Sequence, residues 1–171
     1  YGQGEPTTAM VDAIRADLPQ GVKRVVAIGG GAVMDTAKML SLHTSAGKTE
    51  ALFDLSPGAE KPTRIFDVYA VPTTCGTGSE VTYGGIVTMG DTGYKTAIID
   101  PLLSASHAVL IPELLYSLSD RVFLHCSADA LGHAMEAHVS RTRGNEMARA
   151  AGARAVRLIT EGYAEWLLAG G

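Results

Sequence analysis

The stretch that decides the fold is VVAIGGGAVMDTAKML, residues 25–40. Its first four residues are apolar and follow a proline-glycine break at residues 19–21, which favours a buried strand over residues 22–28. Three consecutive glycines, Gly29 to Gly31, come next, and helical spacing of apolar residues then continues through residues 32–42. The order of strand, glycine turn and helix predicts an α/β fold.

The triple-glycine turn is a candidate phosphate-binding site. Glycine lets the backbone approach a phosphate, and a helix N-terminus offers N–H groups and the positive end of its dipole. The turn matches neither the Gly-x-Gly-x-x-Gly fingerprint nor a Walker loop. Asp35, in the first helical turn, either complements the dipole or hydrogen-bonds the ribose or amide of a nucleotide. A strand-to-helix turn without a ligand is the alternative interpretation.

A second glycine-containing loop follows another predicted strand. Residues 65–71 are mostly apolar, and PTTCGTGSEVT, residues 72–82, comes directly after them. Hydroxyl groups beside an approachable backbone suit phosphate and sugar oxygens. A purely structural turn remains the alternative, but such a turn does not need four small hydroxyl residues in addition to two glycines.

A candidate metal site lies in DALGHAME, residues 129–136. Asp129 and His133 are four residues apart, so on a helix their side chains share one face. A carboxylate and an imidazole presented together would form half of a divalent metal site. The alternative is a capping or ion-paired aspartate beside a hydrogen-bonded histidine. His125, one turn earlier, falls on the same stripe and is a further candidate ligand.

The remaining pattern completes the expected order of elements. A helix is expected over residues 7–18, with Thr7 or Thr8 as its cap. A surface excursion is expected over 47–62, a hairpin formed by 81–88 and 94–99 around the turn 90–93, and a short strand over 108–111. Ser119 and Asp120 are expected to cap the helix that carries Asp129, and Asn145 a last helix. The buried face of that last helix is predicted to hold Met147, Ala151, Ala155, Leu158, Ile159, Gly162 and Trp166.

Composition excludes several classes of protein. The 171 residues are 46% apolar and 19% charged, as in a globular enzyme, and the net charge of −4 gives no footprint for nucleic acid. Two distant cysteines and no long apolar run predict a cytoplasmic protein without a membrane span. The chain begins without Met and ends as a helix ends, so we expect a fragment of a longer protein.

Three stretches in this order, GGGAVMDTAK (residues 29–38), PTTCGTGSE (72–80) and DALGHAME (129–136), resemble the iron-containing (group III) alcohol dehydrogenases. The resemblance extends over essentially the whole chain. Within that family, PTTCGTGSE and LIPELL (110–115) look most like the 4-hydroxybutyrate dehydrogenases. The chain departs from the family at Ala32, where serine is usual, which puts one cofactor hydrogen bond in doubt.

The resemblance implies a dehydroquinate synthase-like architecture of two domains. Residues 1–118 would be a partial α/β Rossmann-like dinucleotide-binding domain, and residues 119–171 the start of an all-helical metal-binding domain. The cofactor, NAD or NADP, would be bound by Gly29, Gly30, Gly31, Ala32, Asp35, Thr73, Thr74, Thr77, Thr82 and Lys95. The metal, Fe(2+) or alternatively Zn(2+), would be held by Asp129 and His133 with two histidines supplied beyond residue 171.

The implied activity is reversible hydride transfer between a primary alcohol and a nicotinamide cofactor, with 4-hydroxybutyrate and succinic semialdehyde as a candidate substrate pair. The alternatives are another enzyme of the same scaffold, such as a glycerol dehydrogenase or a dehydroquinate synthase, and a catalytically incomplete nucleotide-binding fragment. We expect a small-molecule alcohol or aldehyde as partner, no nucleic acid or membrane, and a homo-oligomer. The isolated segment is expected to be inactive and to self-associate through open sheet edges.

Overall fold

The computed structural model describes residues 4–90, 92–142 and 144–170, which form two compact units. The first contains the described residues of Tyr1–Thr73 and Ser79–Leu114, and the second those of Thr74–Gly78 and Leu115–Gly171. A five-residue loop therefore belongs to the second unit, although its neighbours in sequence on both sides belong to the first. The sequence places the change of domain at residues 118–119, close to the last of these transitions.

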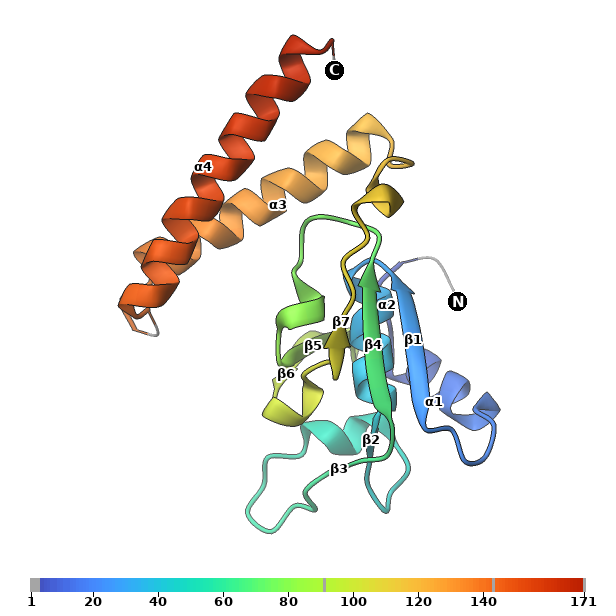
Figure 1. The fold of residues 1–171 in the computed structure, drawn as a ribbon. Helices are drawn as coiled ribbons and strands as arrows, with labels where there is room; N and C mark the ends of the chain where they lie inside the picture. The colour runs from blue at the N-terminus through green and yellow to red at the C-terminus, as the bar shows by residue number, and fades with distance from the viewer. Residues whose placement is uncertain (1–3, 91, 143, 171) are drawn as a thin grey trace. The chain divides into compact units, whose positions relative to one another are not determined.

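A parallel sheet forms the centre of the first unit (Figure 1). Its described strands are β1 (Arg24–Gly29), β4 (Asp67–Pro72) and β7 (His107–Ala108), in the order β1-β4-β7. The predicted strands over 22–28 and 65–71 are confirmed within one or two residues. The strand predicted over 108–111 is shorter, and Pro112 begins the 3-10 helix η4 (Pro112–Leu115) soon after it.

Two helices accompany this sheet. α1 (Thr8–Asp17) begins after Thr7, whose hydroxyl accepts a hydrogen bond from the N–H of Met10, as expected of a cap. α2 (Gly31–Leu40) packs against β1 and β4. The buried apolar core between these elements consists of Val11, Ala27, Met34, Ala37, Met39, Leu40, Leu42, Leu52, Phe66, Val68, Ala70, Val87, Ile98 and Leu103.

The predicted burial of the strand over residues 22–28 is correct for only one face of β1 in the described chain. Ala27 is buried, whereas Val26 and Ile28 are 59% and 60% exposed. Successive side chains of a strand point to opposite faces, so only the face that meets α2 is covered by described residues. An apolar run indicates that both faces suit burial, but it does not say what covers each of them.

The hairpin is confirmed as the antiparallel pair β5 (Gly84–Thr88) and β6 (Lys95–Ile99), and its predicted turn includes residue 91, which lies outside the described residues. Val81 belongs to the 3-10 helix η2 (Ser79–Val81), so the first strand of the hairpin begins at Gly84 rather than at residue 81. The excursion over 47–62 is not wholly at the surface, because η1 (Thr49–Phe53) buries Thr49 and Leu52. Sequence analysis missed the short pair β2 (Leu42–His43) and β3 (Thr63–Arg64), and also η3 (Pro101–Leu103).

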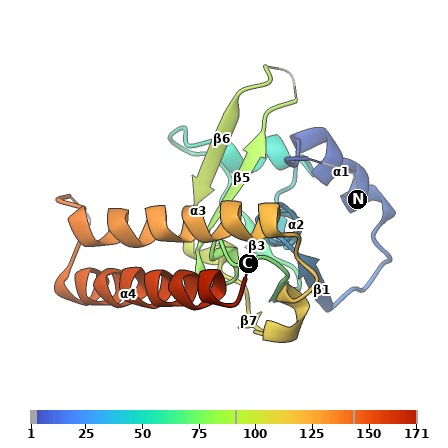
Figure 2. The ribbon, with the colours of Figure 1, turned by 90° about the horizontal axis from the view of Figure 1, so that it is seen from above.

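The second unit is built on two long helices, α3 (Asp120–Val139) and α4 (Glu146–Leu168), which pack side by side (Figure 2). Ser119 and Asn145 cap them as predicted, each accepting a hydrogen bond from a backbone N–H three residues on. The helices touch closely at Gly152, where an added Cβ would lie 2.6 Å from the carbonyl oxygen of Ala134.

The predicted inner face of α4 is only partly correct. Ala155, Ile159 and Trp166 are half-buried, and the ring of Trp166 packs on Phe123 of α3. The other predicted members are exposed, namely Met147, Ala151, Leu158 and Gly162. No helix in the described ranges is both long and apolar enough to cross a membrane.

Arg15 closes the end of α2, and its loss should destabilise the first unit. Its guanidinium donates to the carbonyl oxygens of Met39, Leu40 and Leu42 at 2.8–3.2 Å. We expect Arg15→Met to lower the free energy of unfolding by about 2 kcal/mol, because hydrogen bonds from a charged donor to helix-terminal carbonyls are lost. Denaturant unfolding measures this. Exposed Arg24→Met is the control, and an equal loss there would contradict the assignment.

Candidate cofactor turn and metal helix

The glycine turn leaves the N-terminus of α2 without a side-chain cap. Gly30 is the N-cap residue, with φ −79° and ψ −173°, and no side chain caps the helix in the described chain. Its carbonyl oxygen accepts hydrogen bonds from the N–H groups of Val33 and Met34 at 3.1 and 3.2 Å. The backbone angles of Gly30 are open to any residue, so they do not by themselves demand glycine there. A helix N-terminus of this kind suits a phosphate.

Gly29 has a different and structural reason to be glycine. A Cβ added to it would lie 2.6 Å from Cγ2 and 2.7 Å from Cβ of Val33. The end of β1 and the first turn of α2 are thus packed closely at this point. Gly29 sets the approach of strand to helix, and Gly30 is the better test of ligand contact.

Thr73 lies beside the glycine turn. β1 and β4 are parallel neighbours with Gly29 opposite Pro72, and the N–H of Thr73 donates to the carbonyl oxygen of Gly29 at 3.0 Å. The starts of the two predicted loops therefore meet at the carboxyl edge of the sheet, which is where open α/β sheets bind ligands. Sequence analysis expected both loops to serve one cofactor, and the register brings Gly29 and Thr73 together.

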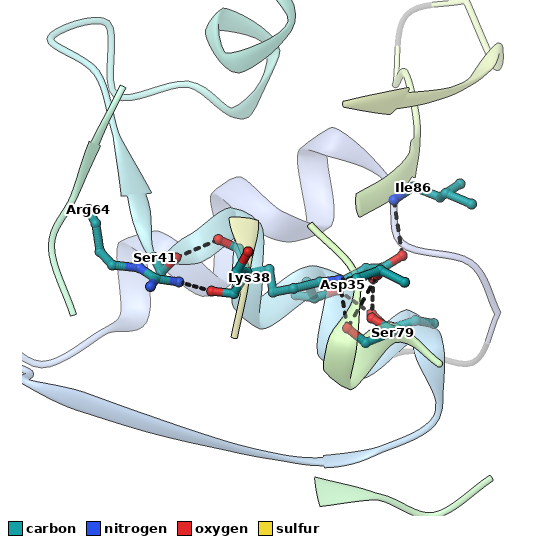
Figure 3. A network of polar contacts seen from close by, with 10 residues as sticks. Asp35, Lys38, Ser41, Arg64, Ser79 and Ile86 are labelled. Carbon is teal, nitrogen blue, oxygen red and sulfur yellow. Dashed lines mark hydrogen bonds and ion pairs between the residues drawn. The ribbon is translucent and has the colours of Figure 1, made fainter. Parts of the chain in front are cut away.

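Asp35 is held by protein groups on both carboxylate oxygens (Figure 3). Oδ1 accepts from Oγ of Ser79 at 2.5 Å and lies 3.0 Å from Nζ of Lys38, and Oδ2 accepts from the N–H of Ile86 at 3.0 Å. The Lys38 side chain is fully buried and also donates to the carbonyl oxygen of Ser79 at 3.0 Å. This buried pair ties α2 to η2 and β5. The predicted contact of Asp35 with a nucleotide stays a prediction.

Two other predicted cofactor residues also have protein partners. Thr82 accepts a hydrogen bond from Lys38 Nζ at 3.3 Å, and Lys95 forms an ion pair with Glu5 in which both side chains are about half exposed. Sequence analysis assigned nothing to Lys38. Its spacing of three residues from Asp35 on a predicted helix was the available signal, since residues at that spacing are neighbours.

Asp129 and His133 share one face of α3, as their spacing predicts. Nδ1 of His133 lies 3.8 Å from Oδ2 of Asp129, and the two side chains are 54% and 47% exposed. A pair that served only to stabilise a core would be buried, whereas this one presents an imidazole and a carboxylate to solvent. These donor types fit Fe(2+) or Zn(2+). Among the described residues no group of three or more ligating side chains gathers, so His125 does not complete a site.

The loop Thr74–Gly78, which carries the predicted cofactor residues Thr74 and Thr77, lies against α3 within the second unit. A Cβ on Gly76 would lie 2.9 Å from Oδ2 of Asp129 and 3.0 Å from the carbonyl oxygen of Cys126, so only glycine allows this approach. Sequence analysis missed this role of Gly76. Burial and the neighbouring Cys75 thiol, with a smaller effect of Asp129, raise the pKa of Cys126.

The fold and these two groups of residues define a dinucleotide-type α/β unit followed by a helical unit with an exposed carboxylate–imidazole pair. The family model of the iron-containing alcohol dehydrogenases matches residues 2–112. The chain therefore belongs to the iron-containing alcohol dehydrogenase family.

Relatives and solved structures agree with this assignment. The chain is 38% identical over 164 residues to a 4-hydroxybutyrate dehydrogenase of Clostridium kluyveri, covering 95% of this chain and 43% of that protein. It is 33% identical over 137 residues to an NAD-dependent methanol dehydrogenase of Bacillus methanolicus, covering 80% of this chain and 35% of the relative. A sulfoacetaldehyde reductase from Bifidobacterium kashiwanohense in complex with NAD+ superposes with a TM-score of 0.79 at 26% identity, covering 92% of this chain and 42% of that chain.

The chain spans less than half the length of these relatives. The resemblance and the expected fold class are confirmed: the described chain has a parallel sheet with helices followed by an all-helical segment, as the matched structures lead one to expect.

Proposed function

We propose that the protein to which this chain belongs is a metal-dependent alcohol dehydrogenase that transfers a hydride between a primary alcohol and a nicotinamide dinucleotide. The likeness to 4-hydroxybutyrate dehydrogenase supports 4-hydroxybutyrate and succinic semialdehyde as the substrate pair. NAD is the proposed cofactor and Fe(2+) the proposed metal, with NADP and Zn(2+) as the alternatives. The protein is proposed to act in the cytoplasm as a homo-oligomer.

One observation carries the proposal. Asp129 and His133 lie 3.8 Å apart on one helix face while each side chain stays about half exposed. Exposed ion pairs contribute little to stability, and a pair of this kind on a helix is worth only a few tenths of a kcal/mol. Its residue types and its exposure are compatible with two ligands of a divalent metal, and the family membership of the chain supports that interpretation.

The residues of this chain would divide the work between binding and positioning. The backbone of Gly30 and Gly31 and the first turn of α2 would hold the pyrophosphate, and Thr73, Thr74 and Thr77 would hydrogen-bond the cofactor. Asp129 and His133 would supply two ligands to the metal. When bound, the metal supplies a Lewis acid that polarises the substrate oxygen, and the nicotinamide ring accepts or gives the hydride.

The direct test is an assay of the purified full-length protein. The protein should contain a divalent metal and should reduce NAD when 4-hydroxybutyrate is supplied. The reaction is measured by the absorbance of the reduced nicotinamide. Methanol and glycerol, offered at the same concentration, are the comparison substrates. A protein that binds NAD but oxidises none of these alcohols would remove the enzyme proposal and leave a nucleotide-binding module.

Gly30→Val tests the cofactor turn at a position whose backbone angles suit valine. Because Gly30 has backbone angles that valine adopts readily, the variant should fold, whereas the branched side chain would stand between the helix N-terminus and a phosphate. We expect NAD affinity, measured by calorimetry, to fall on the order of a hundredfold, as losing charge-assisted hydrogen bonds would give.

Gly29→Ala is the contrasting control for that experiment. Its Cβ would collide with Val33, so it should lower the unfolding temperature of the first unit. Unchanged NAD affinity in a folded Gly30→Val protein would show that the glycine turn does not bind the cofactor.

A further inference from the structure

Cys75 and Cys126 are brought together by the contact between the loop Thr74–Gly78 and α3, although they are 51 residues apart in the sequence. Gly76 follows Cys75 directly, and a Cβ on Gly76 would lie 3.2 Å from the Cα of Cys126. The sulfur of Cys75 lies 3.9 Å from the hydroxyl of Ser127, the residue after Cys126. Neither the dehydrogenase proposal nor the packing of α3 on α4 explains why two thiols meet here.

The backbone of Cys75 also lies close to the thiol of Cys126. The sulfur of Cys126 accepts a hydrogen bond from the backbone of Cys75, and a thiolate at Cys75 would raise the pKa of Cys126. The backbone nitrogen and the Cβ of Cys75 are bonded to the same Cα. A sulfur that contacts this N–H therefore also lies near the Cys75 side chain. Both cysteines are free and half-buried, so a small oxidant has access to them.

Cys75 and Cys126 lie near Asp129, but in the described ranges no group of three or more histidine, cysteine, aspartate or glutamate side chains is arranged to hold an ion. Two adjacent, accessible thiols can be oxidised to a disulfide, and because the pKa of Cys126 is raised, Cys75 is the better candidate for the attacking thiolate.

We propose that Cys75 and Cys126 are a peroxide-sensitive thiol pair that forms an intramolecular disulfide between the loop Thr74–Gly78 and α3. One thiolate attacks hydrogen peroxide, the O–O bond breaks, and the sulfur becomes a sulfenic acid as water is released. The second thiolate attacks that sulfur and displaces hydroxide, which leaves as water. In sum, two thiols and one peroxide give one disulfide and two waters, and a thiol reductant reverses the change.

The cross-link would attach the loop covalently to α3 one turn before Asp129. It would fix the position of a segment that otherwise rests on the helix through non-covalent contacts at Gly76. The proposal does not depend on the dehydrogenase activity, because it concerns only the thiols and their covalent state.

The experiment uses the reduced full-length protein, freed of reductant and exposed to hydrogen peroxide. Remaining thiols are then alkylated, and unreduced peptides are analysed by mass spectrometry. We expect a peptide that joins residue 75 to residue 126 as the main oxidised product, and we expect a thiol reductant to abolish it. Its absence, with both thiols alkylated, over-oxidised or cross-linked between molecules, would overturn the proposal.

Two single variants separate proximity from general reactivity. Cys75→Ser and Cys126→Ser each leave one thiol without its partner, so the peptide must disappear and the surviving sulfur should persist as a sulfenic acid that dimedone labels. In the wild-type protein dimedone labelling should be at least tenfold lower, because the second thiol consumes the sulfenic acid. Equal labelling of wild-type and variant proteins, each checked to be folded by its melting curve, would also overturn the proposal.

Discussion

In the full-length protein, Asp129→Ala is expected to remove bound metal and hydride transfer together, with a rate loss on the order of a thousandfold or more. The same result is expected for His133→Ala. The proposed metal stabilises charge on the substrate oxygen, so the loss of one ligand weakens the ion and the transition state together. Phosphate binding at the glycine turn should survive, because that turn is carried by α2 and not by α3.

The control for this experiment is His125→Ala. His125 is exposed on the same helix, one turn before Asp129, and should keep both metal and activity. Metal analysis and a melting curve for each variant decide the matter. If Asp129→Ala and His133→Ala keep stoichiometric metal but melt at a lower temperature, the pair is structural and the proposed enzyme loses its metal site.

Asp35→Ala should be among the most destabilising single substitutions in the first unit. It would leave the Lys38 ammonium, which is 0% exposed, with only a carbonyl and a hydroxyl as partners. Removing one member of a buried ion pair costs about 3–5 kcal/mol, because the remaining charge stays desolvated. We expect a loss of that size in the free energy of unfolding, measured with denaturant.

The double variant Asp35→Ala with Lys38→Met should recover part of this loss, since no isolated charge then remains in the core. The exposed pair Arg157–Glu161 on α4 is the contrast, with side chains 74% and 56% exposed. Arg157→Ala should cost about 0.5 kcal/mol or less. A double variant that is as unstable as the sum of its single variants would mean that Asp35 and Lys38 act independently.

Much of the fold could be predicted from local patterns alone. The apolar run before Gly29, the caps at Thr7, Ser119 and Asn145, and the hairpin all appear close to where periodicity and cap residues place them. These signals act within a few residues, so no tertiary knowledge was needed. The spacing of Asp129 and His133 likewise fixed their common helix face.

What could not be predicted depends on partners distant in sequence. Gly76 is near Asp129 only because the loop packs on α3, and the two cysteines meet for the same reason. Asp35 looked equally suited to a ligand or to a helix dipole, and only the fold brings Ser79 and Ile86 to its oxygens. The exposed face of α4 was misjudged because Met147 and Leu158 satisfy helical spacing without lying on the face that meets α3.

The assignment of Thr74–Gly78 to the helical unit has a topological consequence. The chain passes from one unit to the other after Thr73, after Gly78 and after Leu114, so the two units are joined by three covalent connections. Protease cleavage between Leu114 and Leu115 alone would not release an intact helical unit. The cleaved pieces would either separate, with loss of the contact between the loop Thr74–Gly78 and α3, or stay associated through that contact. A truncated variant that contains the whole second unit must therefore include residues 74–78 together with the two helices.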